Sequence, residues 1–97
     1  MARFDLYRAE VGFILDVQSN LLDDLTTRLV APLLPLEGAP IPAGRLNPVL
    51  DIEGRLYSLQ PQLMGAVPAH ALGRRAGDAS RHYDRIVAAI DMVFLGF

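Results

Sequence analysis

The chain ends on SRHYDRIVAAIDMVFLGF, residues 80–97, and this stretch predicts an amphipathic helix that begins at Ser80. Serine is favourable at a helix N-terminus, and neither proline nor glycine interrupts the run before Gly96. At about 100° per residue, a stripe roughly 120° wide collects most of the apolar side chains and should pack on the rest of the protein. That stripe contains Tyr83, Ile86, Val87, Ile90, Val93, Phe94 and Phe97.

The opposite side of this helix has the features of a contact surface. Asp84, Ala88 and Asp91 lie there, and Leu95 projects among them. A leucine surrounded by polar residues is a poor core residue, and the helix dipole disfavours an aspartate near the C-terminus. We expect Asp91, Leu95 and the terminal carboxylate to dock a cationic, partly apolar partner. The alternative is a frayed terminus with one stray leucine.

The sequence before the helix predicts short strands joined by turns. Residues 3–8 and 11–17 should pair antiparallel, with a bend or bulge at Gly12. The best strand candidate is 26–34, although Pro32 cannot donate to a ladder and predicts an edge, a bulge or a strand end. The remaining segments are expected as a proline-rich surface loop at 35–44, a hairpin of 48–52 and 55–59 turning at Glu53 and Gly54, a short strand at 70–72 and a loop at 73–77.

Together these segments predict one domain over residues 1–97. Its class is α+β and mostly β: five or more short antiparallel strands in a strongly bent sheet or open barrel, followed by a C-terminal helix. The hydrophobic fraction of 52% is enough for a core, and the net charge of −2 does not favour direct nucleic-acid binding. No apolar run is long enough to span a membrane, so we expect a cytoplasmic protein.

The residue types present exclude several kinds of chemistry. All nine cations are arginine and there is no cysteine, which excludes Schiff-base lysines, P-loops and thiolate sites. Ser80, His82 and Asp84 are close in sequence, but Ser80 and His82 lie about 200° apart around a helix and cannot form a catalytic pair. We therefore expect no catalytic residues, no metal and no cofactor.

Three stretches resemble the CcdB toxins of bacterial toxin–antitoxin modules. They are FILDVQSNLLDDLTTRLVAPL (13–33), NPVLDIEGRLYSLQPQLMGAVP (47–68) and AIDMVFLGF (89–97). The resemblance covers nearly the whole chain apart from the proline-rich loop. It implies a homodimer of small SH3-like (CcdB/MazF-like) barrels without catalytic activity, which binds the A subunit of DNA gyrase and traps the enzyme on cleaved DNA. It also implies a CcdA-like antitoxin that neutralises the toxin, and contact with operator DNA only through that complex.

Carried over to this chain, the resemblance places the gyrase contacts on an apolar pair after DVQS and on the helix end. These positions are Leu21, Leu22, Asp91, Phe94, Leu95, Gly96 and Phe97. The residues that would contact the antitoxin are not indicated. Without the resemblance, an apolar pair in a loop such as Leu21 and Leu22 predicts burial under the domain.

Two positions depart from the family's best-known members. Those members have tryptophan at the position of Leu95 and a polar amide at that of Asp91. Leucine keeps the apolar contact but loses a cation–π attraction of about 0.5–2 kcal/mol, part of which Asp91 could offset by pairing with the same cation. Two alternatives remain: a MazF-like endoribonuclease toxin, or a CcdB homologue that does not poison gyrase and retains only antitoxin binding.

Overall fold

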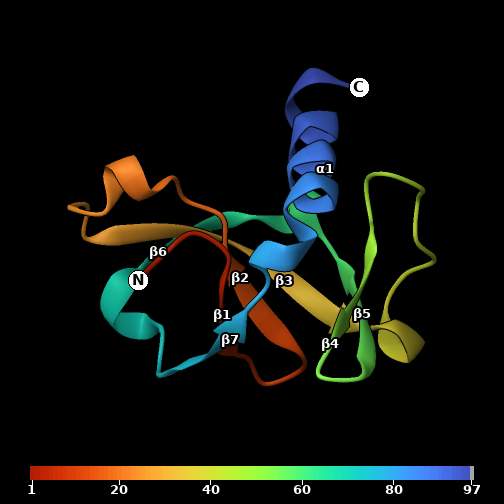
Figure 1. Cartoon of the computed structure of the whole chain (residues 1–97), viewed down its shortest axis with the longest axis horizontal. Coiled ribbons are helices and arrows are strands. Elements are labelled where there is room, and N and C mark those ends of the chain that lie inside the picture. The colour runs from red at the N-terminus through yellow and green to blue at the C-terminus, as the bar shows by residue number, and fades with distance from the viewer. Residues whose placement is uncertain (97) are drawn as a thin grey trace.

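The computed structural model describes residues 1–96, which fold as a strongly curved sheet with one helix rising from it (Figure 1). The strands are short, and single-turn 3-10 helices join several of them. Within the described residues the strands are β1 (Asp5–Arg8), β2 (Phe13–Asp16), β3 (Thr27–Pro35), β4 (Val49–Ile52), β5 (Arg55–Leu59), β6 (Gly65–Pro68) and β7 (Arg75–Asp78), and the helix is α1 (Tyr83–Leu95).

The strands form a curled antiparallel half-barrel around β3. Their order is β4-β5-β3-β2-β1-β7, and β6 pairs with β3 outside this path. On one side β3 pairs with β2, and on the other it pairs first with β6 and then with β5. This confirms the predicted fold class, with both expected hairpins, β1–β2 and β4–β5, in place.

Pro32 lies in the middle of β3 and not at an edge or a strand end. Its carbonyl oxygen accepts a hydrogen bond from the Gln60 amide at 2.9 Å, so its nitrogen also faces the β5 and β6 side of the strand. The β6 ladder stops at Val30 and the β5 ladder starts at Leu33. Pro32 therefore occupies the short interval between two partner strands, where no donor is needed.

Two turns depend on left-handed backbone conformations. Gly12 has φ +77°, and a Cβ atom there would collide with the carbonyl oxygen of Leu33, which makes this bend specific for glycine. In the β4–β5 hairpin, Glu53 and Gly54 both have positive φ (55° and 84°), as a type I′ turn requires. The Asp51 carboxylate accepts a hydrogen bond from the Gly54 amide at 2.8 Å.

Neighbouring residues along the strands alternate between two apolar clusters, as the twofold period of a strand predicts. Leu6 and Ala31 belong to the main cluster, whereas Tyr7 and Val30 belong to a smaller one with Leu72. The two clusters therefore cover opposite faces of the sheet. The main cluster also contains Phe4, Phe13, Leu15, Val17, Leu33, Leu50, Ile52, Tyr57, Leu59, Ala79, Ile86 and Ala89.

The helix begins close to the predicted position but by a different local mechanism. A 3-10 turn (Ser80–His82) precedes α1, and Ser80 is not the N-cap: the Asp78 carboxylate accepts from both its amide (2.8 Å) and its hydroxyl (3.0 Å). The 13-residue α1 is neither long nor apolar enough to cross a membrane, and the same holds for every helix among residues 1–96.

The buried face of α1 differs from the predicted stripe because it includes Ala89. Ile86 and Ala89 are buried, whereas Tyr83 and Phe94 are 49% and 67% exposed. Phe94 belongs to the apolar stripe by helical spacing, but its exposure shows that it is not a core residue. Tyr83 lies at the edge, where its ring makes an edge contact with Phe4 at 5.6 Å between centroids.

Two further predictions after β6 are also wrong. The segment predicted as a strand at 70–72 is largely a 3-10 turn (Ala69–Ala71), and the predicted loop at 73–77 contains most of β7. The β7 strand forms because it pairs with β1 and because Arg75 Nε donates to the carboxylate of buried Asp5 at 2.8 Å. This contact joins residues 70 positions apart and leaves no local pattern.

Candidate functional site

The end of α1 projects from the half-barrel into solvent (Figure 1). Asp91 and Gly96 are exposed, Phe94 is 67% exposed and Leu95 is 59% exposed. Gly96 closes the helix in the left-handed conformation (φ 79°), and its amide donates to the Met92 carbonyl at 3.0 Å. The predicted contact residue Phe97 lies outside the described residues. Within residues 1–96, nothing covers this exposed apolar turn.

Electrostatics at this end favour a cationic partner. The last turn of α1 carries no basic residue, so the negative end of the helix dipole is not compensated there. Among residues 1–96, Asp91 is not part of any ion pair. An exposed carboxylate beside two exposed apolar side chains can bind an arginine or lysine side chain together with its aliphatic stem.

Leu21 and Leu22 lie on an exposed 3-10 turn (Asn20–Leu22) between β2 and β3. Their side chains are 93% and 49% exposed, so the expectation of burial drawn from the loop context is wrong. Side chains of the two preceding residues hold the turn by hydrogen bonds. Ser19 Oγ accepts from the Leu21 amide at 3.2 Å, and the buried Gln18 side chain donates to the Leu22 carbonyl at 2.8 Å.

A buried ion pair fixes the residues on both sides of this turn. Arg28 Nε donates to Asp16 Oδ2 at 2.7 Å, and both side chains are almost completely buried. Arg28 Nη1 also reaches Asp23 at 3.1 Å, directly after the turn. The hydrogen bond to Asp16 raises the pKa of Arg28 further above its ordinary value, so the guanidinium stays charged. The exposed leucines therefore stand on a rigid base.

The structure does not bring the two predicted contact areas together within one protomer. Figure 1 shows the turn before β3 and the end of α1 at separate places on the molecule. The helix packs through Ile86 and Ala89 on the main apolar cluster and also contacts the 3-10 turn Pro61–Leu63. One protomer thus offers two distinct exposed apolar areas.

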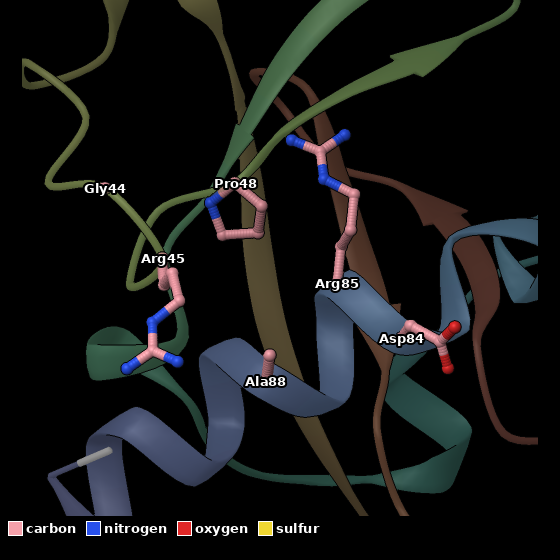
Figure 2. A pocket seen from close by; sticks show the side chains of 6 residues that line it. All are labelled: Gly44, Arg45, Pro48, Asp84, Arg85 and Ala88. Atoms are coloured by element: carbon pink, nitrogen blue, oxygen red, sulfur yellow. The ribbon is translucent and has the colours of Figure 1, made fainter.

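A groove of about 420 Å³ runs between the proline-rich loop and α1 (Figure 2). Pro48 and Ala88 lie in its middle, and the Arg45 and Arg85 side chains extend on either side of Pro48. At helical spacing, Ala88 shares its side of α1 with Asp91 and Leu95. The groove therefore extends the exposed helix face toward the sheet. Gly44 and Asp84 complete its lining.

The two histidines and Ser80 occupy unrelated places. His70 is exposed on its 3-10 turn, and His82 Nε2 lies 3.1 Å from the Asp51 carbonyl oxygen. Ser80 Oγ is engaged with Asp78. A search of residues 1–96 finds no group of three histidine, aspartate or glutamate side chains placed to hold a metal ion.

Comparison with known proteins identifies the family. The family model described as CcdB protein matches residues 3–96. The chain belongs to the CcdB family. Members of this family are toxins of toxin–antitoxin modules, which is the functional class the match supports, with an antitoxin as partner. A search of curated proteins finds no match.

Solved structures show the same fold at low sequence identity. A mycobacterial endoribonuclease in complex with its cognate antitoxin aligns with a TM-score of 0.78 at 12% identity, covering 97% of this chain and 94% of that one. The toxin MazF-mt6 of Mycobacterium tuberculosis aligns with a TM-score of 0.73 at 16% identity, covering 93% and 95%. The chain therefore shares its fold with these two proteins.

Sequence reasoning missed the loop side of the groove beside α1. Ala88, Asp91 and Leu95 could be grouped from helical spacing alone. Arg45 and Pro48 could not, because the proline-rich loop has no period that places it against a particular face of α1. Each proline fixes one φ angle and so stiffens the loop, but the prolines do not indicate where the loop packs on the molecule.

Proposed function

We propose that the protein is a toxin that binds the A subunit of DNA gyrase through the end of α1 and traps the enzyme on cleaved DNA. The observation that carries this proposal is the projecting helix end, where Leu95 and Asp91 are exposed side by side with Phe94. Membership of the CcdB family supports it. The protein performs no chemistry itself and acts by binding.

Each part of the surface has a separate role in this proposal. Phe94 and Leu95 supply the apolar contact, and Asp91 pairs with a cation of gyrase. Gly96 ends the helix in the left-handed conformation, and Phe97 is a further contact residue. Leu21 and Leu22 form a second contact on their rigid turn. Each protomer has two separate contact areas, the Leu21–Leu22 turn and the end of α1. A homodimer would therefore present four contact areas to gyrase.

The remaining partners follow from the toxin–antitoxin class. A CcdA-like antitoxin neutralises the toxin, and the complex of the two represses its own operon, so that the toxin meets operator DNA only through the antitoxin. The net charge of −2 agrees with this indirect role, since a protein that binds DNA alone usually presents a large basic face.

A gyrase cleavage assay with purified protein tests the proposal. The wild type should accumulate cleaved DNA and arrest growth when expressed. Leu95→Asp should weaken both effects about 10- to 100-fold, because it removes roughly 1.5–3 kcal/mol of apolar contact and buries a charge. Val11→Asp is the matched control, since Val11 is 60% exposed and lies in the β1–β2 turn.

Stability measurements complete this test. Both variants should stay folded, because neither side chain belongs to the core. Leu95→Asp should lower the urea midpoint slightly, because an anion at the end of α1 opposes the helix dipole. Full activity of Leu95→Asp would contradict the proposal. So would unfolding of this variant, because the helix end would then serve the fold.

The likeness to a mycobacterial endoribonuclease favours one competing function, RNA cleavage. That reaction needs a general base and a cation at the scissile phosphate. Incubation of the purified protein with single-stranded RNA distinguishes the two functions, since a gyrase poison leaves the RNA intact. A third outcome is a protein that binds its antitoxin but neither cleaves RNA nor arrests growth. That protein would be the non-poisoning CcdB homologue, in which Leu95 and Asp91 no longer support gyrase binding.

A further inference from the structure

The N-terminal residue Arg3 lies between the two proposed contact areas. Its amide donates to Asn20 Oδ1 at 2.8 Å, and Asn20 begins the 3-10 turn that carries the exposed leucines, here called the leucine turn (Asn20–Leu22). Its guanidinium lies over the ring of Tyr83, the first residue of α1, at 5.7 Å from the ring centroid. Arg3 thus contacts the leucine turn through its backbone and α1 through its side chain.

The backbone of Phe4 makes a second connection between the same two regions. Its amide donates to the Asp16 carbonyl at 2.6 Å, and its carbonyl accepts from the Ala79 amide at 2.9 Å. Asp16 ends the strand before the leucine turn, and Ala79 directly precedes the 3-10 turn that leads into α1. Phe4 has φ +69°, a left-handed conformation that is strained for an aromatic residue and persists only where the surrounding contacts fix it. Residues 3–4 are therefore a firmly held joint between the leucine turn and α1.

Two aromatic rings orient the Arg3 side chain. The guanidinium also lies 4.8 Å from the centroid of the Phe4 ring, and the Phe4 and Tyr83 rings meet edge to face at 5.6 Å. Arg3 Nε is buried and has no hydrogen-bond partner among residues 1–96, so attraction to the ring faces holds this cation. The 13-residue α1 is about 20 Å long, so a tilt of about 5° at Tyr83 would move the exposed Leu95 by about 2 Å.

We propose that Arg3 is a positioning residue, which couples the leucine turn to α1 and thereby sets the position of the helix end relative to Leu21 and Leu22. This inference rests on the proposed function, in which both areas bind gyrase. Arg3 itself does not contact gyrase in this role. Two areas that are held in a fixed relative position lose less entropy on binding than two areas that move separately. Loss of the coupling therefore weakens binding although every contact residue is still present.

The affinity of single and double variants for the gyrase A subunit tests this inference. Arg3→Met keeps an unbranched side chain but removes the charge over Tyr83, and Asn20→Ala removes the acceptor of the Arg3 amide. Each change should weaken binding about three- to tenfold. The double variant should bind no more weakly than either single variant, because the two contacts act in series and the loss of one already breaks the coupling. Arg3→Lys keeps a cation over the rings and should restore most of the affinity.

Arg8→Met is the matched control for Arg3→Met. The Arg8 guanidinium also lies over an aromatic ring, at 5.3 Å from the centroid of Phe13, but this pair belongs to the β1–β2 hairpin. Arg8→Met should therefore bind gyrase like the wild type. Equal weakening by Arg8→Met would overturn the inference, because the loss would then follow from the change in charge alone. Losses that add in the double variant Arg3→Met/Asn20→Ala would also overturn it, because independent structural effects add.

Amide NMR spectra test the coupling without gyrase. Asn20→Ala should shift the amide signals of Tyr83 and Asp84 at the start of α1, and the same change in the Arg3→Met background should leave these signals in place. Equal shifts in both backgrounds, or no shift in either, would refute the inference and leave the proposed function intact. A wild type that shows the expected shifts but does not bind gyrase would refute the proposed function, while the coupling itself would stand.

Discussion

At the scale of single residues, buried polar side chains hold the exposed apolar ones in position. Asp16 accepts from Arg28 and from the Gln18 amide, and Gln18 ties the Leu22 carbonyl to the Leu29 amide. The turn is thus fixed mainly by the DVQS segment and Arg28, together with the Arg3 amide, which donates to Asn20 Oδ1 at 2.8 Å. The leucines can remain exposed because their position depends on these hydrogen bonds and not on their own burial.

Asp16→Asn should therefore destabilise the protein strongly. The change removes the buried charged partner of Arg28 and leaves only the half-exposed Asp23 carboxylate, which costs about 3–5 kcal/mol. The control is Glu37→Gln, which breaks the pair with Arg55 at 2.8 Å, where both side chains are more than half exposed. That pair should contribute much less, because solvent screens two exposed charges. Urea unfolding measures both variants, and equal losses would show that the buried pair has no special role.

Tyr7 should make stability depend on alkaline pH. Burial, followed by repulsion from Asp5 and Asp16, raises the pKa of Tyr7 above its ordinary value of 10.0. A raised pKa means that the contribution is complete below pH 10.0 and is lost as the pH rises, because the unfolded chain ionises first. The urea midpoint of the wild type should fall above this pH, and Tyr7→Phe should fall less. Parallel curves for the two proteins would contradict this expectation.

At the scale of elements, the sequence predicted the helix and strands that are specified by neighbouring residues. The β4–β5 hairpin follows from alternation and from Glu53-Gly54, and α1 follows from an uninterrupted helical period. The β7 strand was predicted as a loop because its cause is the distant Asp5. Helical spacing alone placed Phe94 in the packing stripe, because spacing indicates which residues share a face but not where the supporting sheet ends. Only the family resemblance indicated Phe94 as a contact residue.

Some residues of the candidate site could likewise be predicted from local spacing, and others could not. Asp91 and Leu95 were grouped by helical spacing, and the structure exposes both. The loop context of Leu21 and Leu22 predicted that they are buried, and only the family resemblance implied that they are exposed. Local reasoning failed here because the polar residues that hold the turn are spread over 13 positions, 16–28. The contact of Arg3 with Tyr83 could not be predicted from sequence, since the two residues lie near opposite ends of the chain and meet only in the folded protein.

At the scale of the whole molecule, one apolar groove stands apart from the surfaces already described. It has a volume of about 260 Å³ and lies on the face of the sheet that carries the smaller cluster of Tyr7, Val30 and Leu72. Leu63 at its border is 59% exposed. Solvent would be excluded from this groove if two copies met there. It is lined by Ile14, Val30, Pro32, Leu63, Gly65, Ala66 and Val67.

We expect the protein to be a homodimer whose interface includes this groove. Sedimentation equilibrium should give about twice the mass of the 10.6 kDa chain. Leu63→Glu should shift the equilibrium toward monomer, and a twofold interface doubles the effect because each change occurs on both copies. Val11→Asp, at 60% exposure in the β1–β2 turn, should remain dimeric. A dimer that tolerates Leu63→Glu would place the interface elsewhere, and a monomer at all concentrations would exclude the homodimer itself. In that case one protomer would have to bind gyrase with two separated apolar areas, and Leu21→Asp and Leu95→Asp should then weaken binding independently.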